Sequence, residues 1–405
     1  MTESYVREER QTPVLARPEV LVAGGGFAGI AAALAAARLG KKVMLIERMF
    51  LLGGLGTSGL VTIYLPLCDG RGRQVSFGLA EELLRLSVRE HCDGARGVEN
   101  WLTHRPSDLA TRAAGHRFEV NFNPQLFAIS AEQTLLDAGV EILYGTSVTA
   151  VEREEDRITA VFVETKGGRY AVLPEMVVDA TGDADLAYMA GLETALYAPG
   201  NHLAAWYYYS GKEGYGLKPM GMVDQTEEEM ARNPVSRLST RSFRGLDGRE
   251  LSEITCLSHA AILNDVRRKK ESDPTYEPVT VATIPQMRMT RRLVGAYTLD
   301  EGEVHKRQED SVGMVSDWRK RGPVFEVPYG TLYSSACANL ATAGRCTSVT
   351  DPMWDIMRVI PCCSVTGQAA GTAAALCHDY RHLSVSALQI QLQKDGVVLH
   401  EDDLA

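Results

Sequence analysis

A glycine-rich turn in the first tenth of the chain restricts its fold more than any other feature. Residues 20–23 are apolar, too few for a helix and followed by glycines, so they predict a buried strand. An alanine-rich helix is expected over 30–39, and a second strand over 42–46 ends at Glu47. Between strand and helix, glycines stand at the G-x-G-x-x-G positions Gly24, Gly26 and Gly29. This order of elements is the context in which that motif binds a dinucleotide.

Each glycine of the motif has a physical role. Gly24 allows a tight turn, Gly26 has no Cβ to block a pyrophosphate, and Gly29 lets helix and strand pack closely. The helix N-terminus adds unpaired N–H groups and a partial positive charge that favour phosphates. We therefore assign the whole turn to the cofactor site: Gly24, Gly26, Phe27, Ala28 and Gly29.

The residues after the second strand bear on which dinucleotide is bound. Glu47 is placed to accept hydrogen bonds from an adenosine ribose. Arg48 beside it is compatible with a 2′-phosphate, so NADP stays an alternative. Three later features favour FAD.

The first of these features is a second glycine-rich loop over 51–60, which would let backbone approach a flat ligand. The second is a strand over 176–179 that feeds a turn of small residues and an aspartate. The third is a small-residue helix expected to begin near Thr366, whose dipole would stabilise a reduced, anionic flavin. These features, with the ends of two further strands, complete the predicted cofactor site: Gly53, Gly54, Gly56, Thr57, Val148, Ala180, Thr181, Gly182, Asp183, Gly344, Arg345, Thr366, Gly367, Gln368 and Ala369.

The pattern of elements predicts an α/β fold. We expect a Rossmann-like FAD-binding domain, with a parallel sheet and an antiparallel β-meander, and a small α+β cap or substrate domain. The predicted division is a polar N-terminal extension (1–18), the first part of the FAD-binding domain (19–191), the cap (192–290) and the C-terminal part of the FAD-binding domain (291–405).

Several stretches together resemble the FAD-dependent oxidoreductases related to the fumarate reductase and succinate dehydrogenase flavoproteins. They are VLVAGGGFAGIAAALAAARLGKKVMLIER, LLGGLGTSGLV, VVDATGDADLA, MTRRLVGAYTL, and NLATAGRCTS with the nearby RVIPCCSVTGQAAGTAAAL. The resemblance implies an FAD-binding domain, a cap over the isoalloxazine and redox chemistry at flavin N5. The chain departs from those relatives at Val349-Thr350-Asp351, where they often carry Thr-His. It also has no histidine in 53–59, where relatives with covalent flavin attach it, so we expect non-covalent FAD.

Candidate catalytic residues lie around residue 290 and on a predicted strand over 202–210. Arg288 or Arg291 would place a guanidinium over the flavin to bind a carboxylate or donate a proton, as the resemblance implies. A structural arginine cluster explains the same residues. His202 is a candidate acid or base, although a lone histidine on a strand is more often simply packed. The segment before the last cofactor helix would line the substrate pocket with Asp351, Trp354, Arg358 and Cys362.

Composition limits the partners. The net charge of −10 provides no basic surface for nucleic acid or an anionic membrane, and the longest apolar run is too short to span a bilayer. The eight cysteines form no C-x-x-C pair, which indicates reduced thiols in a cytoplasmic protein and no metal site.

We therefore expect a cytoplasmic FAD-dependent oxidoreductase that moves a hydride between a small organic substrate and flavin N5. Whether it forms a homo-oligomer stays open. The electron acceptor stays open. Two alternatives are a flavoprotein that acts on a macromolecule such as RNA and an NADP-dependent dehydrogenase.

Overall fold

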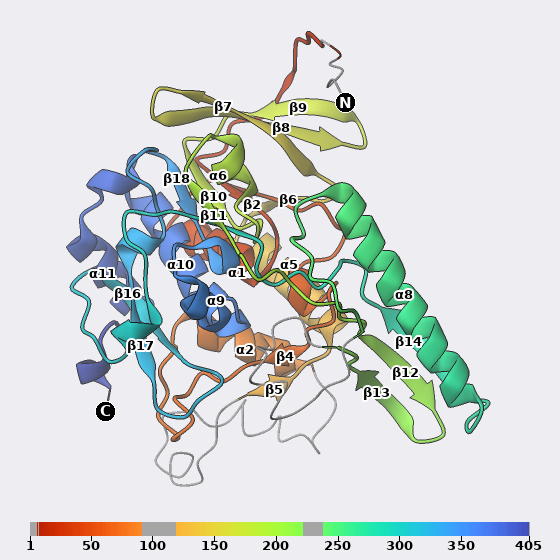
Figure 1. Cartoon of the computed structure of the whole chain (residues 1–405). Helices are drawn as coiled ribbons and strands as arrows, with labels where there is room; N and C mark the ends of the chain where they lie inside the picture. Colours follow the sequence, from red (N-terminus) through yellow and green to blue (C-terminus); the bar gives the residue numbers. More distant parts are fainter. Residues whose placement is uncertain (1–5, 7, 91–118, 222–237, 405) are drawn as a thin grey trace.

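The computed structural model describes residues 6, 8–90, 119–221 and 238–404. At its centre is a five-stranded parallel sheet, with strand order β18-β10-β2-β3-β6 (Figure 1). Its strands are β2 (Val20–Ala23), β3 (Val43–Ile46), β6 (Glu141–Leu143), β10 (Met176–Asp179) and β18 (Leu340–Thr342). The strand β18 is far in sequence from the other four, which all lie between residues 20 and 179. The parallel sheet with its helices confirms the predicted α/β fold.

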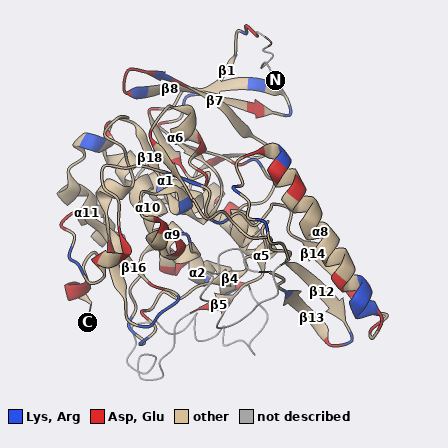
Figure 2. Ribbon diagram, viewed as in Figure 1, with Lys and Arg blue, Asp and Glu red and all other residues tan. Residues whose placement is uncertain are grey.

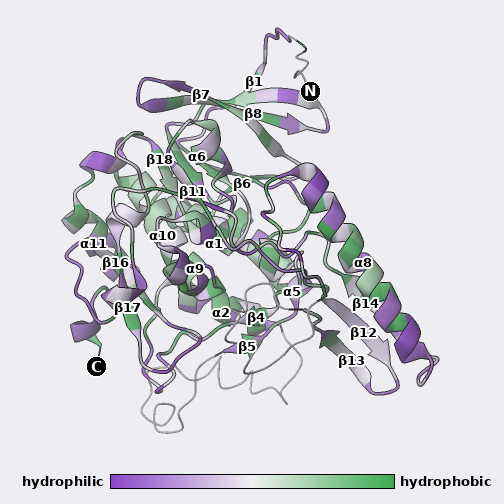
Figure 3. Ribbon diagram, viewed as in Figure 1, coloured by the Kyte–Doolittle hydropathy of each residue, from purple (hydrophilic) through white to green (hydrophobic). Residues whose placement is uncertain are grey.

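The inner strands are continuous apolar runs because both faces of the sheet are covered. Every residue of β2, β3, β10 and β18 is buried, and Figure 3 shows this centre as mostly hydrophobic. Helix α1 (Phe27–Arg38) packs against α10 (Ile360–Leu376) at very short range. A Cβ on Gly367 would lie 2.2 Å from the carbonyl oxygen of Ala28, so the two backbones are in contact there.

The start of α10 differs from the expectation. The helix begins at Ile360, with Val359 as its N-cap, and not near Thr366. Pro361 is tolerated in the first turn because that position has no intrahelical N–H bond to lose. The helix dipole therefore begins several residues earlier than the small-residue pattern indicated.

A second sheet packs over one end of the first, at the top of Figure 1. The predicted meander is present as β7 (Ser147–Glu154), β8 (Arg157–Thr165) and β9 (Gly168–Val172). It gains a fourth strand, β1 (Val14–Ala16), which pairs in parallel with β9. The segment predicted as a polar N-terminal extension thus includes a strand, while residues 1–5 and 7 lie outside the described part.

The region predicted as the cap contains a three-stranded sheet of β12 (Tyr207–Gly211), β13 (Gly214–Lys218) and β14 (Glu277–Val281). The long helix α8 (Gly248–Lys270) lies beside it and ends in four basic residues, visible in blue in Figure 2. Because β12 begins at Tyr207, His202 precedes the strand on which we expected it. Residues 222–237 of this region lie outside the described part.

The remaining elements lie around these three sheets (Figure 1). In the described ranges, no single helix is long and apolar enough to cross a membrane. Of the described helices, only the bent pair of α9 (Asp351–Met357) and α10, at 91°, is long and apolar enough when the two are taken together. The other strands and helices are β4 (Ile63–Tyr64), α2 (Leu79–Arg89), β5 (Val120–Asn121), α5 (Pro124–Asp137), α6 (Asp185–Met189), β11 (Thr194–Leu196), β15 (Arg291–Leu293), β16 (Ser311–Ser316), β17 (Val324–Pro328), α9 (Asp351–Met357) and α11 (Val385–Lys394).

Candidate active site

A cavity of about 690 Å³ opens at the carboxyl ends of the parallel strands and continues beneath the predicted cap. Ligands of open α/β sheets bind at this edge. The structure brings most of the predicted site residues into its wall: Gly24, Gly26, Phe27, Ala28, Glu47, Arg48, Gly53, Gly54, Gly56, Val148, Ala180, Thr181, Gly182, Asp183, Gly344, Arg345, Arg288 and Arg358.

The three motif glycines differ in what surrounds the position of a Cβ. Gly24 has a φ of +100°, and a Cβ there would lie 2.4 Å from the carbonyl oxygen of Ala180. A Cβ on Gly29 would lie 1.8 Å from the carbonyl oxygen of Gly24, so this glycine closes the turn and does not line the cavity. A Cβ on Gly26 would meet no atom within 4 Å. Of the three, Gly26 alone leaves open space, and that space belongs to the cavity.

The carboxylate of Glu47 is fixed beside the turn. Its Oε2 accepts a hydrogen bond from the Gly25 N–H at 2.7 Å, and its Oε1 accepts one from the Met49 N–H at 2.8 Å. The residue is only 7% exposed. Each carboxylate oxygen has a further lone pair, so Glu47 can still accept hydrogen bonds from a ligand.

The second glycine-rich loop docks directly on the first. The Gly53 N–H donates to the Gly25 carbonyl at 2.8 Å, and Gly26 and Gly53 form an isolated parallel bridge. Gly53 and Gly54 both have a positive φ, which residues other than glycine rarely adopt. The Thr57 hydroxyl donates to the Leu52 carbonyl within the loop, so Thr57 supports the loop and does not line the cavity.

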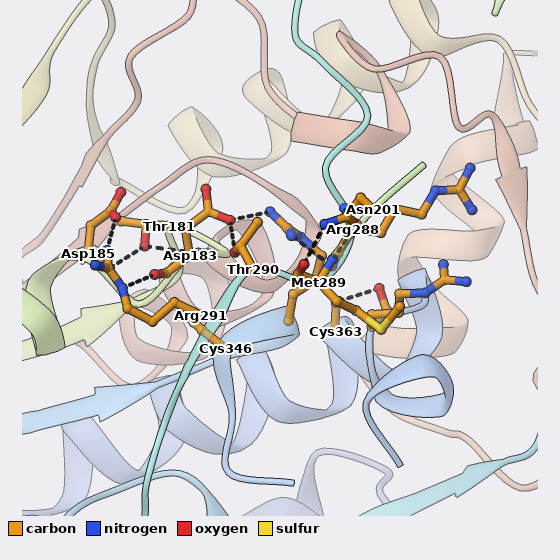
Figure 4. Close-up of polar contacts among 12 residues, drawn as sticks. Thr181, Asp183, Asp185, Asn201, Arg288, Met289, Thr290, Arg291, Cys346 and Cys363 are labelled. Carbon is orange, nitrogen blue, oxygen red and sulfur yellow. Dashed lines mark hydrogen bonds and ion pairs between the residues drawn. The ribbon is translucent and has the colours of Figure 1, made fainter. Parts of the chain in front are cut away.

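The turn after β10 is tied to the segment that leaves the predicted cap (Figure 4). The Asp183 Oδ1 accepts hydrogen bonds from the Thr290 hydroxyl at 2.6 Å and from the Arg345 Nη2 at 3.3 Å. The Arg345 Nη1 donates to the Arg288 carbonyl at 2.9 Å. Asp183 and Arg345 line the cavity, whereas Thr290 lies behind its wall.

Arg291 points toward the cofactor turn and does not line the cavity. Its Nε donates to the Asp183 carbonyl at 2.9 Å, its Nη2 pairs with Asp185 Oδ1 at 2.7 Å, and its guanidinium lies 4.0 Å from the Tyr188 ring centroid. Burial, with the negative charges of Asp183 and Asp179, raises the pKa of Asp185 to about 6. Arg291 therefore supports the turn, which corrects its assignment as an arginine facing substrate.

Arg288 does line the cavity, and it is only 6% exposed. Its guanidinium lies 5.2 Å from the Trp206 ring centroid, and its Nη2 donates to Gln286 Oε1 at 3.3 Å. Its backbone N–H donates to Asn201 Oδ1 at 2.9 Å. Burial, followed by the positive charge of Arg345, lowers its pKa to about 10, so the side chain is still protonated at neutral pH.

Arg358 provides a second guanidinium to the same wall, from the C-terminal part of the chain between α9 and α10. Its Nη2 and Nε donate to Asp355 Oδ1 at 2.6 and 2.9 Å, and the guanidinium lies 5.6 Å from the Trp318 ring centroid. Burial lowers its pKa to about 10 as well. Trp206 and Trp318 both line the cavity, so two arginine–tryptophan pairs from distant segments share one space.

A family model described as FAD dependent oxidoreductase matches residues 19–205 and 212–394, most of the chain. The chain belongs to the FAD dependent oxidoreductase family. The protein is therefore an oxidoreductase whose cofactor is FAD, and the finer likeness to fumarate reductase stays a prediction. No curated protein matches the chain.

The chain is similar to several solved structures at low identity. A geranylgeranyl bacteriochlorophyll reductase-like protein from Thermoplasma acidophilum is 14% identical, with 94% of this chain and 82% of that chain covered and a TM-score of 0.44. The p-nitrophenol 4-monooxygenase of Pseudomonas putida is 13% identical (95% and 81% covered, TM-score 0.41). The 3-ketosteroid-Δ4-(5α)-dehydrogenase of Rhodococcus jostii RHA1 is 15% identical (90% and 100% covered, TM-score 0.40). These likenesses carry no information about this protein's substrate.

The residues of the turn fit FAD. The open space at Gly26 and the N-terminus of α1 suit a pyrophosphate, and the fixed carboxylate of Glu47 suits a ribose. At the other end of the cavity, Val359 and Ile360 line the wall where α10 begins, and no side chain caps that helix N-terminus.

Across the described ranges, no three His, Cys, Asp or Glu side chains gather where they could hold a metal ion.

The residues expected at the start of the last cofactor helix are instead inside α10. The Thr366 hydroxyl accepts from the Gly344 N–H at 2.9 Å, Gly367 packs on α1, and Gln368 Oε1 accepts from the Leu79 N–H at 2.7 Å. Ala369 is fully buried beside them. None of the four lines the cavity, because the helix starts earlier than its small-residue pattern suggested.

Four further candidates lie outside the cavity wall. His202 is half-buried in the segment before β12, and Asp351 pairs with Arg292 Nη2 at 3.3 Å. The Trp354 indole N–H donates to the Arg345 carbonyl at 2.5 Å, which positions that residue from behind. Cys362 is buried, with its Sγ–H toward the Ile356 carbonyl. Cys363 lines the cavity in its place.

Sequence reasoning missed the rest of the wall. Most of these residues are apolar and belong to no short motif, so only the tertiary contacts reveal them. Asp185 and Leu55 are exceptions, because Asp185 lies two residues after the predicted turn and Leu55 lies inside the predicted loop 51–60. The missed lining residues are Ala23, Ile46, Met49, Leu55, Val61, Ile63, Leu65, Thr146, Ser147, Asp185, Trp206, Gly245, Leu251, Ile284, Pro285, Met287, Trp318, Ala343, Val359, Ile360 and Cys363.

Proposed function

We propose that this oxidoreductase transfers a hydride between a small organic substrate and its FAD. The observation that carries the proposal is the continuity of the cavity. The glycine turns and the two arginine–tryptophan pairs line one space, so a second molecule can reach the cofactor. Its volume, about 690 Å³, lies within the range of about 300–1,000 Å³ that is usual for ligand pockets.

Bound FAD would supply a two-electron carrier that takes or gives a hydride. The chain's own residues would hold it: backbone N–H groups at the N-terminus of α1 would face its phosphates, and Glu47 would accept from its ribose. The uncapped N-terminus of α10, at Val359, would place partial positive charge on the opposite side of the cavity.

At the substrate end, the chain would bind and orient the reacting molecule. Trp206 and Trp318 line this end and would cover the apolar surface of a substrate. Arg288 and Arg358, both protonated at neutral pH, would donate hydrogen bonds to an oxygen of the substrate. Each guanidinium has five N–H donors, so it can keep its protein contacts and still bind a ligand.

The test mixes the FAD-loaded enzyme anaerobically with a panel of small alcohols, amines and acids. The rate of flavin reduction is measured from the loss of flavin absorbance. Arg288→Met should retain FAD and reduce about 100-fold more slowly, because its guanidinium lines the cavity. The matched control is Arg241→Met, since Arg241 also covers an aromatic ring, that of Phe243, but does not line the cavity. Equal rates in wild type and Arg288→Met would contradict the assignment.

We also propose that the FAD is held without a covalent bond. The described wall contains no histidine or tyrosine, and its one cysteine, Cys363, has a pKa raised to about 12 by burial. A buried neutral thiol is a poor nucleophile. Acid precipitation should release the yellow cofactor into the supernatant, whereas colour retained in the pellet would show covalent attachment.

A further inference from the structure

Asp183 connects the two ends of the cavity. Its side chain belongs to the turn that follows β10, on the cofactor side of the wall. Its Oδ1 accepts from Thr290, which stands two residues after Arg288, and from Arg345, which also donates to the Arg288 carbonyl. In Figure 4 Thr290 lies between Asp183, which it contacts, and Arg288.

The segment 288–291 is also attached through its backbone, because the Tyr197 N–H donates to the Thr290 carbonyl at 3.0 Å and β15 pairs with β11 at Arg291 and Leu196. On its far side, Asn201 accepts from the N–H groups of Arg288 and Met289 and donates to the Met289 carbonyl at 2.6 Å. On the near side, the hydrogen bonds to the cofactor turn come from Thr290, Arg291 and Arg345. The bonds of Thr290 and Arg345 therefore link the position of Arg288 to that of the turn, in addition to the contacts that Asn201 makes.

The turn and the residue that follows it include two backbone conformations with positive φ. Gly182 has a φ of +81° and Ala184 a φ of +51°, and the second of these is uncommon for a residue with a side chain. Such conformations persist when surrounding contacts hold them. A dinucleotide bound against the turn would add contacts to it, and the hydrogen bonds of Asp183 would pass the added order to the segment that carries Arg288.

We propose that Asp183 and Thr290 form a positioning pair through which FAD binding fixes Arg288 at the substrate end. The inference rests on the proposed function for the role of Arg288, but the coupling itself does not require turnover. Because linkage is reciprocal, whatever holds Arg288 in place also favours FAD binding. Thr290 is suited to testing the pair because it lies behind the cavity wall and its removal takes away no lining atom.

The experiment is hydrogen–deuterium exchange of the full chain, with and without FAD, in three proteins. Thr290→Val removes the hydroxyl and keeps the shape, and Thr290→Ser keeps the hydroxyl. In wild type and Thr290→Ser, FAD should slow exchange of residues 284–292 about tenfold, a usual size for coupling between sites. In Thr290→Val that protection should largely disappear, while residues 20–30 stay protected because FAD still binds.

Two results would overturn the proposal. One is a wild-type protein in which FAD protects residues 20–30 and leaves 284–292 unchanged, which needs no variant to fold. The other is equal protection of 284–292 in Thr290→Val and Thr290→Ser. Neither readout uses a substrate, so failure of the hydride-transfer proposal would appear separately, as an unchanged reduction rate in Arg288→Met.

Discussion

The two ends of the cavity are built in different ways. The cofactor end is built largely from backbone, and its shape depends on glycines such as Gly26, which have no Cβ to fill the space. The substrate end consists of large side chains, with Arg288 and Trp206 from one region and Arg358 and Trp318 from another. A backbone site can be encoded by a few neighbouring residues, whereas a side-chain site requires distant segments to meet.

The same contrast divides the motif glycines. A glycine that packs against backbone is needed for folding, and a glycine that faces empty space is needed for the ligand. Substitutions that add a single Cβ therefore separate the two roles, and further substitutions compare the arginines of the two ends.

The largest effect is expected from Gly24→Ala. The new Cβ would lie 2.4 Å from the Ala180 carbonyl oxygen, at a φ of +100°. Because neither backbone segment can move freely, the free energy of unfolding should fall by about 3–5 kcal/mol. Urea unfolding followed by circular dichroism measures this, and a wild-type midpoint would show that the turn is more adaptable than its geometry implies.

The next effect is expected from Gly26→Ala, on binding and not on folding. A Cβ there meets no protein atom within 4 Å, so the stability of the apoprotein should change by less than about 1 kcal/mol. The same Cβ would occupy space that a pyrophosphate needs, and FAD affinity should fall about 100-fold. Calorimetric titration decides the matter, and an unchanged Kd would place the phosphates elsewhere.

Arg291→Lys tests whether Arg291 differs in role from Arg288. Lysine would lose the hydrogen bond to the Asp183 carbonyl and the contact with Tyr188, at a cost in stability of about 1–2 kcal/mol. Once saturated with FAD, the variant should reduce at nearly the wild-type rate, because Arg291 does not line the cavity. A large loss of rate at full FAD occupancy would return the substrate-facing role to Arg291.

The smallest effect concerns Asp185, whose pKa of about 6 exceeds its ordinary value. A raised carboxyl pKa means that the folded apoprotein prefers the neutral form, so the stabilisation is present at low pH and lost as pH rises through about 6. The side chain is 34% exposed, so solvent screening keeps the change below about 1 kcal/mol. Thermal melts from pH 4.5 to 7 (roughly the range over which this group titrates) should show this slope in wild type and not in Asp185→Asn. Parallel slopes would contradict it.

The fold and the cofactor end were largely readable in the sequence. Local spacing of apolar and glycine residues predicted three features: the strand–turn–helix–strand order, the acidic residue at Glu47 and the meander. These features depend on residues that are neighbours in the sequence, so the sequence pattern is enough to indicate them. The start of α10 was misplaced because glycine and alanine from residue 366 onward looked like a helix beginning. They are small because Gly367 packs against Ala28, which no local pattern reveals.

The amino-acid sequence by itself thus determined the parallel sheet, the glycine turns and the class of cofactor, since these follow from backbone requirements of neighbouring residues. Only the tertiary structure decided which arginine faces the cavity. Arg288 and Arg291 are three residues apart and chemically identical, but Asn201 holds one toward Trp206 while Asp185 draws the other toward Tyr188. The choice depends on partners about 90 to 110 residues away in the chain, and such distant contacts form only when the whole protein folds.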